Sequence, residues 1–478
     1  MDARTIVTGA ALGFSVAVAC ADPHPSTLNQ KCFADENCDA GQQCEKQAGA
    51  DAGFCREEDT AFDSTSSGAA GGDTMIGTSG GVGPTPGSTG ATSEPTAAET
   101  TTEVPGTDTT SDDDTGGGSD SVGSDSTGGE QSCDGVPSPD RVSFGEPNTL
   151  PVDANSQGLA LGDLDGDGTL DFAVTSLGTD TVRTFLGDGL GNFAPAETSL
   201  AGPTPSEIAL GAIADATVDA VIVQSDNTVR RAQGTGDGGF INAQAVGSTD
   251  TAIALVDING DDVLDLLGND GELTVALGTP VGETFGTTIG YPSGVVGSGE
   301  LTVADFDGNG AADVAIAGSI RFAVMLGNGA GTFVAEPPFI LPGQVADIAS
   351  GDFDADDQAD VVVVTQGGGT DAARVYWGGG DGTLSADEVL GTQTGPQYVR
   401  VADLDADGDD DIAVMHTGGA LGISLSNGDG TFAPQQSFPC GDNNNMRGLV
   451  LGDLNGDCAL DAASVSATGD VVCVWLSN

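Results

Sequence analysis

Basic residues are scarce in this chain of 478 residues. Lys and Arg number 12 against 73 Asp and Glu, so the formal net charge at neutral pH is −61. A surface of that charge repels phosphate backbones and anionic lipid headgroups, which argues against nucleic acid as a partner. An acid excess can reflect disorder, adaptation to salt or cation binding, and the positions of the carboxylates distinguish these causes. Many of the acids in this sequence recur in register.

Histidine is nearly absent, with two residues in the whole chain. His24 lies in a polar N-terminal segment, and His416 follows the apolar run Ile412 to Met415 at a turn, where we expect a surface side chain. No Ser/His/Asp or Cys/His constellation can be assembled from these residues. The sequence therefore predicts that the protein is not an enzyme. A secreted enzyme of the lyase or hydrolase class that uses carboxylates alone is the alternative.

The apolar stretch near the N-terminus, Ile6 to Ala19, is too short to span a bilayer. It follows Arg4 and ends in small residues directly before Cys20. This pattern resembles the lipobox of bacterial lipoproteins, which implies a signal peptide at residues 1–19, cleavage before Cys20 and diacylation of its sulfur. We therefore expect an exported protein, lipid-anchored to a bacterial membrane or cell surface. Ala17 stands where the lipobox usually has Leu, so a plain secretory signal is the alternative.

The cysteine count supports the anchor, because nine cysteines are odd and a lipidated Cys20 leaves eight for pairing outside the cytosol. After a tether at residues 20–31, four cysteines crowd into residues 32–55, a segment too short to build a core. We predict a small disulfide-stapled module there. Zinc binding is the alternative, although the close CxxC pairs of zinc sites are missing. The four cysteines are Cys32, Cys38, Cys44 and Cys55.

Residues 56–139 are dominated by Ser, Thr, Gly, Asp and Pro. Such a composition cannot bury enough apolar surface to fold. The acids repel one another and the glycines keep the chain mobile, so we predict an extended, disordered linker.

Residues 140–478 repeat with a period of roughly 48 residues, within the range of propeller blades. Each repeat has an apolar run, an Asp-rich loop, a β-branched run, a further strand, and a Gly-rich turn followed by Phe. Helical periodicity is weak, and the turns are too short for crossover helices. We therefore predict an all-β fold, a seven-bladed β-propeller with four short strands per blade. The repeats begin at Asp163, Ala212, Asp257, Asp305, Asp352, Asp403 and Asp453.

The two ends of this region predict how the ring closes. The last repeat stops at its third strand, Val471 to Leu476, and lacks a fourth. Val142 to Pro147 resembles the fourth-strand segment Phe333 to Pro337, so we expect it to pair beside Val471 to Leu476. Four further cysteines fall near this closure, and the sequence leaves their three possible pairings open. They are Cys133, Cys440, Cys458 and Cys473.

Six repeats contain Asp-x-(Asp/Asn)-x-(Asp/Asn)-x-x-x-Asp, a nine-residue loop with oxygen side chains at alternate positions. Calcium takes six to eight hard oxygen ligands, so we predict about six calcium ions. Magnesium, which demands a strict octahedron, and plain solvated turns are the alternatives. The expected side-chain ligands are Asp163, Asp165, Asp167 and Asp171; Asp257, Asn259, Asp261 and Asp265; Asp305, Asp307, Asn309 and Asp313; Asp352, Asp354, Asp356 and Asp360; Asp403, Asp405, Asp407 and Asp411; and Asp453, Asn455, Asp457 and Asp461. The expected backbone ligands are Thr169, Val263, Ala311, Gln358, Asp409 and Ala459.

Two repeats depart from this pattern. The second keeps Asp215 and Asp219, but it is shortened and lacks the leading Asp, so we expect it to bind no metal. In the seventh, Cys458 stands where other loops have glycine, which leaves open whether that loop binds metal.

The repeat length, the six acidic loops in phase and the trailing Gly-x-Gly-x-Phe turns resemble FG-GAP and VCBS-type repeats, a family that includes the propeller of integrin α subunits. The resemblance covers about residues 140–478. It implies calcium in the loops that join the first two strands of a blade, and a ring face that engages a protein or glycan ligand. We therefore expect a monomeric, calcium-binding recognition or adhesion module, cell-surface or secreted; a purely structural surface scaffold is a further alternative. Trp377 and Trp475 fall on third strands, where we expect them to pack between blades.

Overall fold

The structure is a computed structural model that describes residues 142–213, 217–249, 252–279, 284–297, 299–367, 369, 371–385, 388–441 and 445–477, and the backbone of four short strands nearer the N-terminus. The contacts divide the chain into one unit of residues 1–22 and 130–478 and another of residues 23–129. Apart from the backbone of Val7–Thr8 and Gly53–Glu57, the expected signal peptide and the linker at residues 56–139 lie outside the described residues. The lipidation of Cys20 and the cysteine side chains of residues 32–55 lie outside them as well.

In the smaller unit, three strands form a sheet in the order β2-β4-β3. They are β2 (Lys31–Cys32), β3 (Gln42–Glu45) and β4 (Gly53–Glu57).

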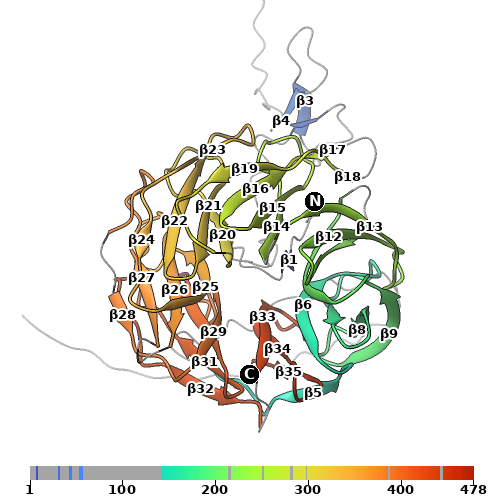
Figure 1. Ribbon diagram of the computed structural model, residues 1–478. Helices are drawn as coiled ribbons and strands as arrows, with labels where there is room; N and C mark the ends of the chain where they lie inside the picture. Colours follow the sequence, from blue (N-terminus) through green and yellow to red (C-terminus); the bar gives the residue numbers. More distant parts are fainter. Residues whose placement is uncertain are drawn as a thin grey trace, which may run out of the picture. The chain divides into compact units, whose positions relative to one another are not determined.

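The larger unit is a seven-bladed β-propeller, and its described residues contain strands and no α-helix (Figure 1). No helix capable of crossing a membrane is therefore found among them. Blade 1 is β6 (Ser156–Gly162), β7 (Asp171–Ser176), β8 (Thr181–Gly187) and β9 (Phe193–Leu200); blade 2 is β10 (Pro205–Gly211), β11 (Asp219–Gln224), β12 (Thr228–Gly234) and β13 (Phe240–Ser248), with β1 (Val7–Thr8) paired to β10; blade 3 is β14 (Ala252–Val256), β15 (Asp265–Asn269), β16 (Glu272–Ala276) and β19 (Ile289–Pro292), with a small ribbon of β17 (Gly278–Thr279) and β18 (Thr284–Phe285).

The remaining blades follow the same plan. Blade 4 is β20 (Leu301–Ala304), β21 (Asp313–Gly318), β22 (Arg321–Gly327) and β23 (Phe333–Ala335), with β24 (Phe339–Ile340) also paired to β22; blade 5 is β25 (Gln344–Gly351), β26 (Asp360–Gln366), β27 (Ala372–Tyr376) and β28 (Glu388–Leu390); blade 6 is β29 (Pro396–Ala402), β30 (Asp411–His416), β31 (Ala420–Ser424) and β32 (Gln436–Pro439); blade 7 is β33 (Met446–Gly452), β34 (Asp461–Ser466), β35 (Val471–Trp475) and β5 (Asn148–Pro151).

The second strand of each blade is buried on both faces, because each sheet is packed between two neighbouring sheets. In β11 and β34 all six residues are buried. This explains why these strands read as continuous apolar runs instead of alternating ones. The last strand of a blade lies at the rim, so β9 and β13 are largely exposed. Burial therefore decreases from the inner strands to the outer strand within each blade.

The ring is closed by a strand from the beginning of the propeller, as the sequence predicts. The inner strands contact one another around the complete circle, β6, β10, β14, β20, β25, β29, β33 and back to β6. Figure 1 shows the teal β5 beside the red β35, and the register pairs Asn148 with Val474 and Pro151 with Val471. The segment chosen from the sequence, Val142 to Pro147, was wrong by a few residues. It contributes one bridge, between Phe144 and Ser477, because the paired strand itself begins at Asn148.

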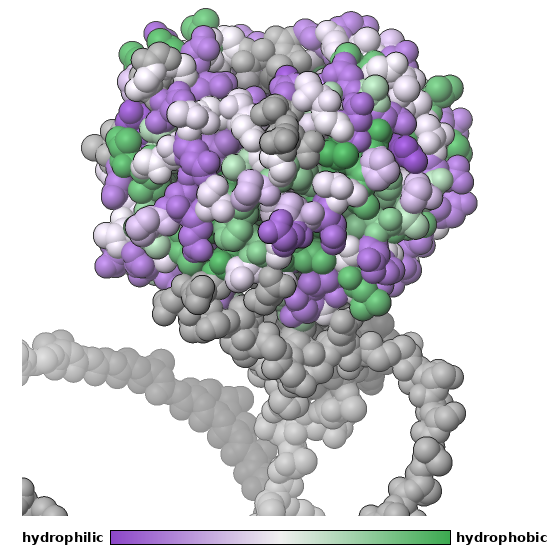
Figure 2. Space-filling model, turned by 90° about the horizontal axis from the view of Figure 1, so that it is seen from below, coloured by the Kyte–Doolittle hydropathy of each residue, from purple (hydrophilic) through white to green (hydrophobic). Residues whose placement is uncertain are grey.

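Both tryptophans pack between blades, as expected. Trp475 is fully buried in a cluster that joins blades 6 and 7, and Trp377 packs partly buried against the cluster between blades 5 and 6. The surface seen in Figure 2 mixes hydrophobic and hydrophilic residues without one dominant hydrophobic area. The apolar surface of the blades is thus mostly used in contacts between sheets.

A disulfide joins Cys440 to Cys473, with the two Cα atoms 6.2 Å apart. It connects the segment after β32 of blade 6 to β35 of blade 7, next to the closure. Cys458 is disulfide-bonded as well. The 440–473 pair therefore fixes one of the three pairings that the sequence left open.

We expect the double substitution Cys440→Ala and Cys473→Ala to lower the free energy of unfolding by about 4 kcal/mol, because a cross-link between cysteines 33 residues apart restricts the unfolded chain by about that amount. The midpoint of denaturant unfolding measures the change. An unchanged midpoint would show that blades 6 and 7 are held together without this bond.

Candidate metal centres

The predicted acidic loops connect the first and second strands of blades 1 and 3 to 7. The first strand of every blade runs in the same direction along the central axis of the ring. The six loops that follow these strands therefore lie on one face of the propeller. Four of them bring three carboxylates so close that one oxygen from each lies within 4.8 Å of the others. These groups are Asp163, Asp165 and Asp171; Asp305, Asp307 and Asp313; Asp352, Asp354 and Asp356; and Asp403, Asp405 and Asp411.

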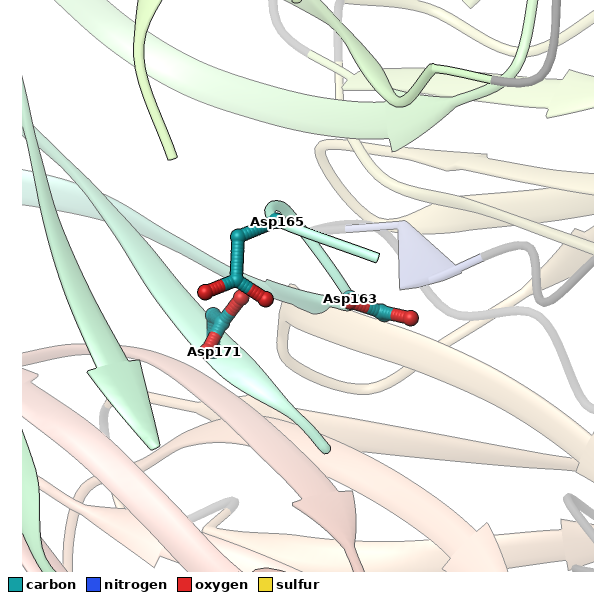
Figure 3. A group of neighbouring side chains, drawn as sticks. All are labelled: Asp163, Asp165 and Asp171. Atoms are coloured by element: carbon teal, nitrogen blue, oxygen red, sulfur yellow. The ribbon is translucent and has the colours of Figure 1, made fainter. Parts of the chain in front are cut away.

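The loop of blade 1 shows how the backbone creates such a group. Asp163 accepts hydrogen bonds from the N–H groups of Gly166, at 2.7 Å, and Gly168, at 3.0 Å, so the chain wraps around its carboxylate. Asp167 Oδ1 accepts from the Thr169 N–H at 2.9 Å. In Figure 3 the side chains of Asp165 and Asp171 point toward each other. The loop therefore turns its carboxylates toward one small volume.

The sixth residue of every loop donates its N–H to Oδ2 of the first aspartate, at 2.7 to 3.0 Å. The donors are Gly168, Asp262, Gly310, Asp357, Gly408 and Cys458, and each has a positive φ. Cys458, at φ 68°, adopts the same backbone conformation as the glycines and donates to Asp453 at 2.9 Å. The departure from glycine at this position therefore leaves the fold of the seventh loop unchanged.

The ninth residue of each loop is an aspartate at the start of the second strand, buried and bonded to backbone through both oxygens. In blade 1, Asp171 Oδ2 accepts from Leu164 N–H at 2.7 Å and Oδ1 accepts from Gly187 N–H at 2.8 Å. The loop and the end of the third strand are thus tied to one carboxylate. The same two bonds recur at Asp265, Asp313, Asp360, Asp411 and Asp461.

Burial raises the pKa of each of these ninth carboxyl groups, and neighbouring loop acids raise it further. The pKa is about 6 for Asp171, Asp265, Asp313 and Asp461, about 7 for Asp360 and about 8 for Asp411. The backbone hydrogen bonds act in the opposite direction but do not compensate. In the absence of a cation, the negative charge of the loops therefore destabilises the folded state. Binding of protons or of a metal ion would reduce this destabilisation.

The donor set fits a hard divalent cation. Every side chain at a predicted ligating position is a carboxylate or an amide, so it offers oxygen. In the loops of blades 3 and 7, Asn259 and Asn455 replace the third-position aspartate, so fewer carboxylates converge there. The acidic clusters could hold metal ions.

The loops also join neighbouring blades. At three junctions the Gly-rich turn after the third strand of one blade donates a glycine N–H to the carbonyl of the second loop residue in the preceding blade. These bonds run from Gly191 to Leu454 at 3.0 Å, from Gly238 to Leu164 at 3.2 Å and from Gly382 to Phe306 at 2.9 Å. These loops are therefore hydrogen-bonded to the adjacent blade.

A hollow of about 820 Å³ lies at the junction of blades 3 and 4. Here the hydroxyl of Tyr291 holds the turn by donating to Gly331 O at 3.0 Å. No backbone bond between Gly331 and Ile258 is present in the described part of the chain. The hollow is lined by Asp257, Ile258, Asp307, Asn309, Leu326 and Val334, among others.

Blade 2 has a different partner for the aspartate at the start of its second strand. Asp219 occupies the ninth position, and its Oδ1 accepts from Gly234 N–H at 2.8 Å, as in the other blades. Its Oδ2 instead accepts from Arg231, at 3.0 Å from Nε and 2.8 Å from Nη2. This pair was not predicted from the sequence, although an arginine within a strand of a chain with so few basic residues was an available signal.

Further charged groups missed from the sequence lie on and beside the inner strands. Arg400 Nη1 pairs with Asp347 Oδ2 at 2.9 Å, and both side chains are buried. Burial raises the pKa of Glu207 well above its usual value and that of Glu300 to about 8; the two acids also repel each other. Each of the two glutamates directly precedes an apolar run, where exposed acids are common at strand ends. The sequence alone therefore did not distinguish them from exposed residues.

The prediction of a surface position for His416 was wrong. Its side chain is 1% exposed, and Nδ1 lies 3.1 Å from the carbonyl oxygen of Ala420. Burial lowers the pKa of this imidazole. The residue ends β30, a second strand that is buried throughout, which explains why its side chain is enclosed.

Comparison with known proteins agrees with the fold. The model of the FG-GAP-like repeat matches residues 305–363, 352–414 and 405–464. A solved structure of BBS1N in complex with ARL6DN, soaked with mercury, is 11% identical and has a TM-score of 0.51, covering 71% of this chain and 98% of that one. No curated protein sequence matches the chain.

Two lectins are similar at lower TM-scores. An Agrocybe aegerita lectin that recognises non-reducing terminal N-acetylglucosamine has a TM-score of 0.46 and 18% identity, covering 66% of this chain and 87% of its own. The BP39L lectin from Burkholderia pseudomallei has a TM-score of 0.46 and 17% identity, with coverages of 69% and 99%. These likenesses concern the fold alone.

We expect the metal-free propeller to lose stability as the pH rises from about 5 to about 8. The raised pKa values mean that the folded state binds protons which the unfolded state has released, so stabilisation is complete below the unfolded pKa and is lost through the folded values of about 6 to 8. Glu207 and Glu300 contribute with the same sign. Thermal melts in chelator across this range measure the effect.

The variant Asp411→Asn provides the comparison, because it removes the group with a pKa of about 8 while keeping the shape of the side chain. Its melting temperature should depend less on pH between 7 and 8. A metal-free protein that is most stable at the alkaline end would contradict this account.

Proposed function

We propose that this chain, an FG-GAP repeat β-propeller, is a calcium-loaded recognition module that binds a glycan or protein ligand and does not catalyse a reaction. It is exported and held at a bacterial membrane or cell surface by lipid on Cys20, acts as a monomer, and is raised from the membrane by residues 56–139. The observation that carries the proposal is the convergence of carboxylates in repeated loops on one face of the ring.

Calcium is the cation that suits these loops best. Their donors are oxygens, several loops offer three or four carboxylates, and the chain around them bends through left-handed residues, which suits a large and flexible coordination shell. Magnesium prefers a smaller, strictly octahedral shell with several waters. We therefore assign about six calcium ions, one to each loop of blades 1 and 3 to 7.

Calcium would act structurally. An ion in a loop compensates the charge of the buried ninth aspartate and of the acids around it, and so stiffens the contact between that loop and the glycine turn of the next blade. A rigid face loses little conformational entropy when it binds a ligand. The acidic surface disfavours anionic partners, which points to neutral or cationic ligands.

We place the ligand in the hollow between blades 3 and 4. Its volume of about 820 Å³ falls within the range of small-molecule sites. Asp257 and Asp307 offer acceptors, no basic side chain lines it, and Val334, 70% exposed, offers an apolar surface beside them. Acceptors next to an apolar patch complement a sugar ring, which has hydroxyl donors at its edge and C–H groups on its faces. A glycan is therefore the favoured ligand.

We expect the purified chain to bind about six calcium ions, and its melting temperature to rise with calcium, because an ion held only by the folded state stabilises it. The variant Asp305→Asn should bind one ion fewer, since it alters the first position of one loop, which is an aspartate in all six loops. Metal analysis after equilibrium dialysis and thermal melts measure both. Glu272→Gln, at an exposed residue on β16, is the control. No uptake of calcium, or equal stabilisation by magnesium, would contradict the assignment.

We expect the chain to bind members of a glycan array in calcium, and Val334→Arg to weaken that binding about tenfold, which corresponds to about 1.4 kcal/mol. Val389→Arg is the matched control, because Val389 is also an exposed valine, 55% exposed, on the outer strand of another blade. Equal loss in both variants, or none in Val334→Arg, would remove the hollow as the site. Capture of a protein by Val334-dependent binding, without glycan binding, would assign a protein ligand instead.

A further inference from the structure

The buried aspartate of blade 2 belongs to a repeat without the full acidic loop. In the six acidic loops, Oδ2 of the ninth aspartate accepts the N–H of the second loop residue, at 2.7 to 3.1 Å. Asp219 is as deeply buried, at 1% exposed, but its repeat is shortened and has no leading aspartate. A buried carboxylate needs a compensating charge or hydrogen bonds. In blade 2 the shortened repeat offers fewer acids that could hold a compensating cation.

Arg231 provides it. Two of its nitrogens, Nε and Nη2, donate to Asp219 Oδ2 at 3.0 and 2.8 Å. The side chain of Arg231 is 9% exposed and that of Asp219 is 1% exposed, so the pair is withdrawn from water. Buried ion pairs of this kind are strongly destabilised when one partner is removed.

No other blade has a basic residue at this position. Arg231 pairs in register with Val221, two residues after Asp219 on the second strand. The residues at the same register in the other blades are uncharged. They are Thr184, Val275, Val324, Val375, Ile423 and Val474. The blade without a full acidic loop is thus the one in which an apolar core position holds a guanidinium.

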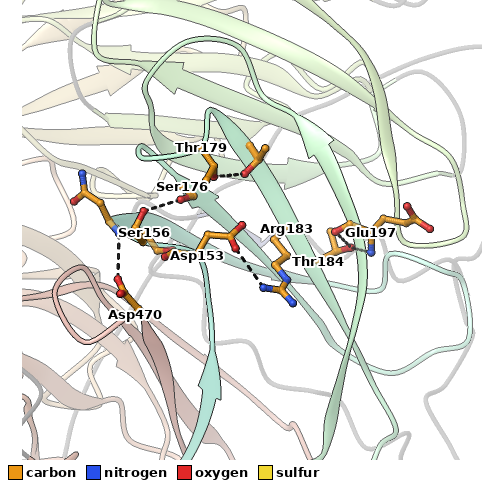
Figure 4. A network of polar contacts seen from close by, with 11 residues as sticks. Asp153, Ser156, Ser176, Thr179, Arg183, Thr184, Glu197 and Asp470 are labelled. Atoms are coloured by element: carbon orange, nitrogen blue, oxygen red, sulfur yellow. Dashed lines mark hydrogen bonds and ion pairs between the residues drawn. The ribbon is translucent and has the colours of Figure 1, made fainter.

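Blade 1 shows that an arginine on the third strand does not by itself form a buried ion pair. Arg183 lies on β8 and pairs with Asp153, but at 3.4 Å and with both side chains nearly 30% exposed (Figure 4). Exposed pairs of this type contribute little to stability. Arg183 therefore serves as an internal reference for the buried pair.

We infer that Arg231 is a built-in cation that takes the place of the metal ion in blade 2 and makes that blade independent of calcium. The comparison with the other blades rests on the proposed function, whereas the role of Arg231 within blade 2 does not. Withdrawal of calcium then affects six blades and leaves blade 2 folded. The ring keeps a permanently ordered element, with its contacts to blades 1 and 3, from which the metal-dependent blades can reorder.

Hydrogen exchange of the full chain, with calcium and with chelator, tests this inference. In the wild type, amides of β10 to β12 should keep their protection in chelator, while second strands of the other blades lose protection. Arg231→Gln should lose protection in blade 2 in both conditions. It should also lower the melting temperature by on the order of 5 °C, equally with and without calcium. Arg183→Gln should change neither quantity.

A second variant separates charge from packing and covers the case in which Arg231→Gln does not fold. The double variant Arg231→Gln with Asp219→Asn leaves no unpaired charge, so it should recover most of the lost melting temperature. A double variant as unstable as Arg231→Gln would show that Arg231 acts through packing, and would overturn the inference. So would rescue of Arg231→Gln by calcium, or one more bound ion in that variant. If no variant takes up calcium but blade 2 responds as expected, the calcium assignment fails and the role of Arg231 stands.

Discussion

The structure depends on one interaction that recurs in six of the seven blades, the two-sided hydrogen bonding of a buried aspartate at the start of the second strand. One oxygen holds the loop before it, and the other holds the end of the third strand, as in Asp171 with Leu164 and Gly187. A neutral side chain would offer fewer acceptor sites for the same backbone groups. The same bonds place a negative charge where water cannot solvate it. In each of these blades the aspartate therefore fixes the loop against the end of the third strand. Its buried negative charge also destabilises the fold unless another group compensates it.

The blades offset this cost in two ways. Blades with the full acidic loop gather further carboxylates around the aspartate, which makes the cost larger in the metal-free state and creates a site that fits a divalent cation. Blade 2 has a shorter loop with fewer acids and uses the guanidinium of Arg231. A guanidinium is permanently charged and tethered, whereas the occupancy of an ion site depends on the concentration of the ion in solution. The charge of the buried aspartate is thus compensated by a covalently held cation in blade 2. In the other six blades an exchangeable ion would compensate it.

The loops also show how a structural ion would affect the proposed ligand site. Their second residues accept hydrogen bonds from the glycine turns of the next blade, so loop order and blade contact are coupled. At the junction of blades 3 and 4 the turn is held by Tyr291, and a hollow lies beside two acidic loops. A site bounded by two such loops would have walls whose rigidity follows their metal content. The acidic loops and the proposed ligand site thus lie next to each other, because residues of two loops line the hollow.

The number of blades, the strand plan, the position of the six acidic loops and the shortened loop of repeat 2 could all be predicted from the sequence, because each follows from the spacing of residue types along the chain. The closure was determined in kind but not in register: β5 begins at Asn148, and only pairing with β35 could set that position. The Asp219–Arg231 pair, the burial of His416 and the Cys440–Cys473 bond depend on which strands become neighbours in space. Spacing along a chain specifies a repeat, but the partner of a buried charge is decided by the side chain that packing brings to it.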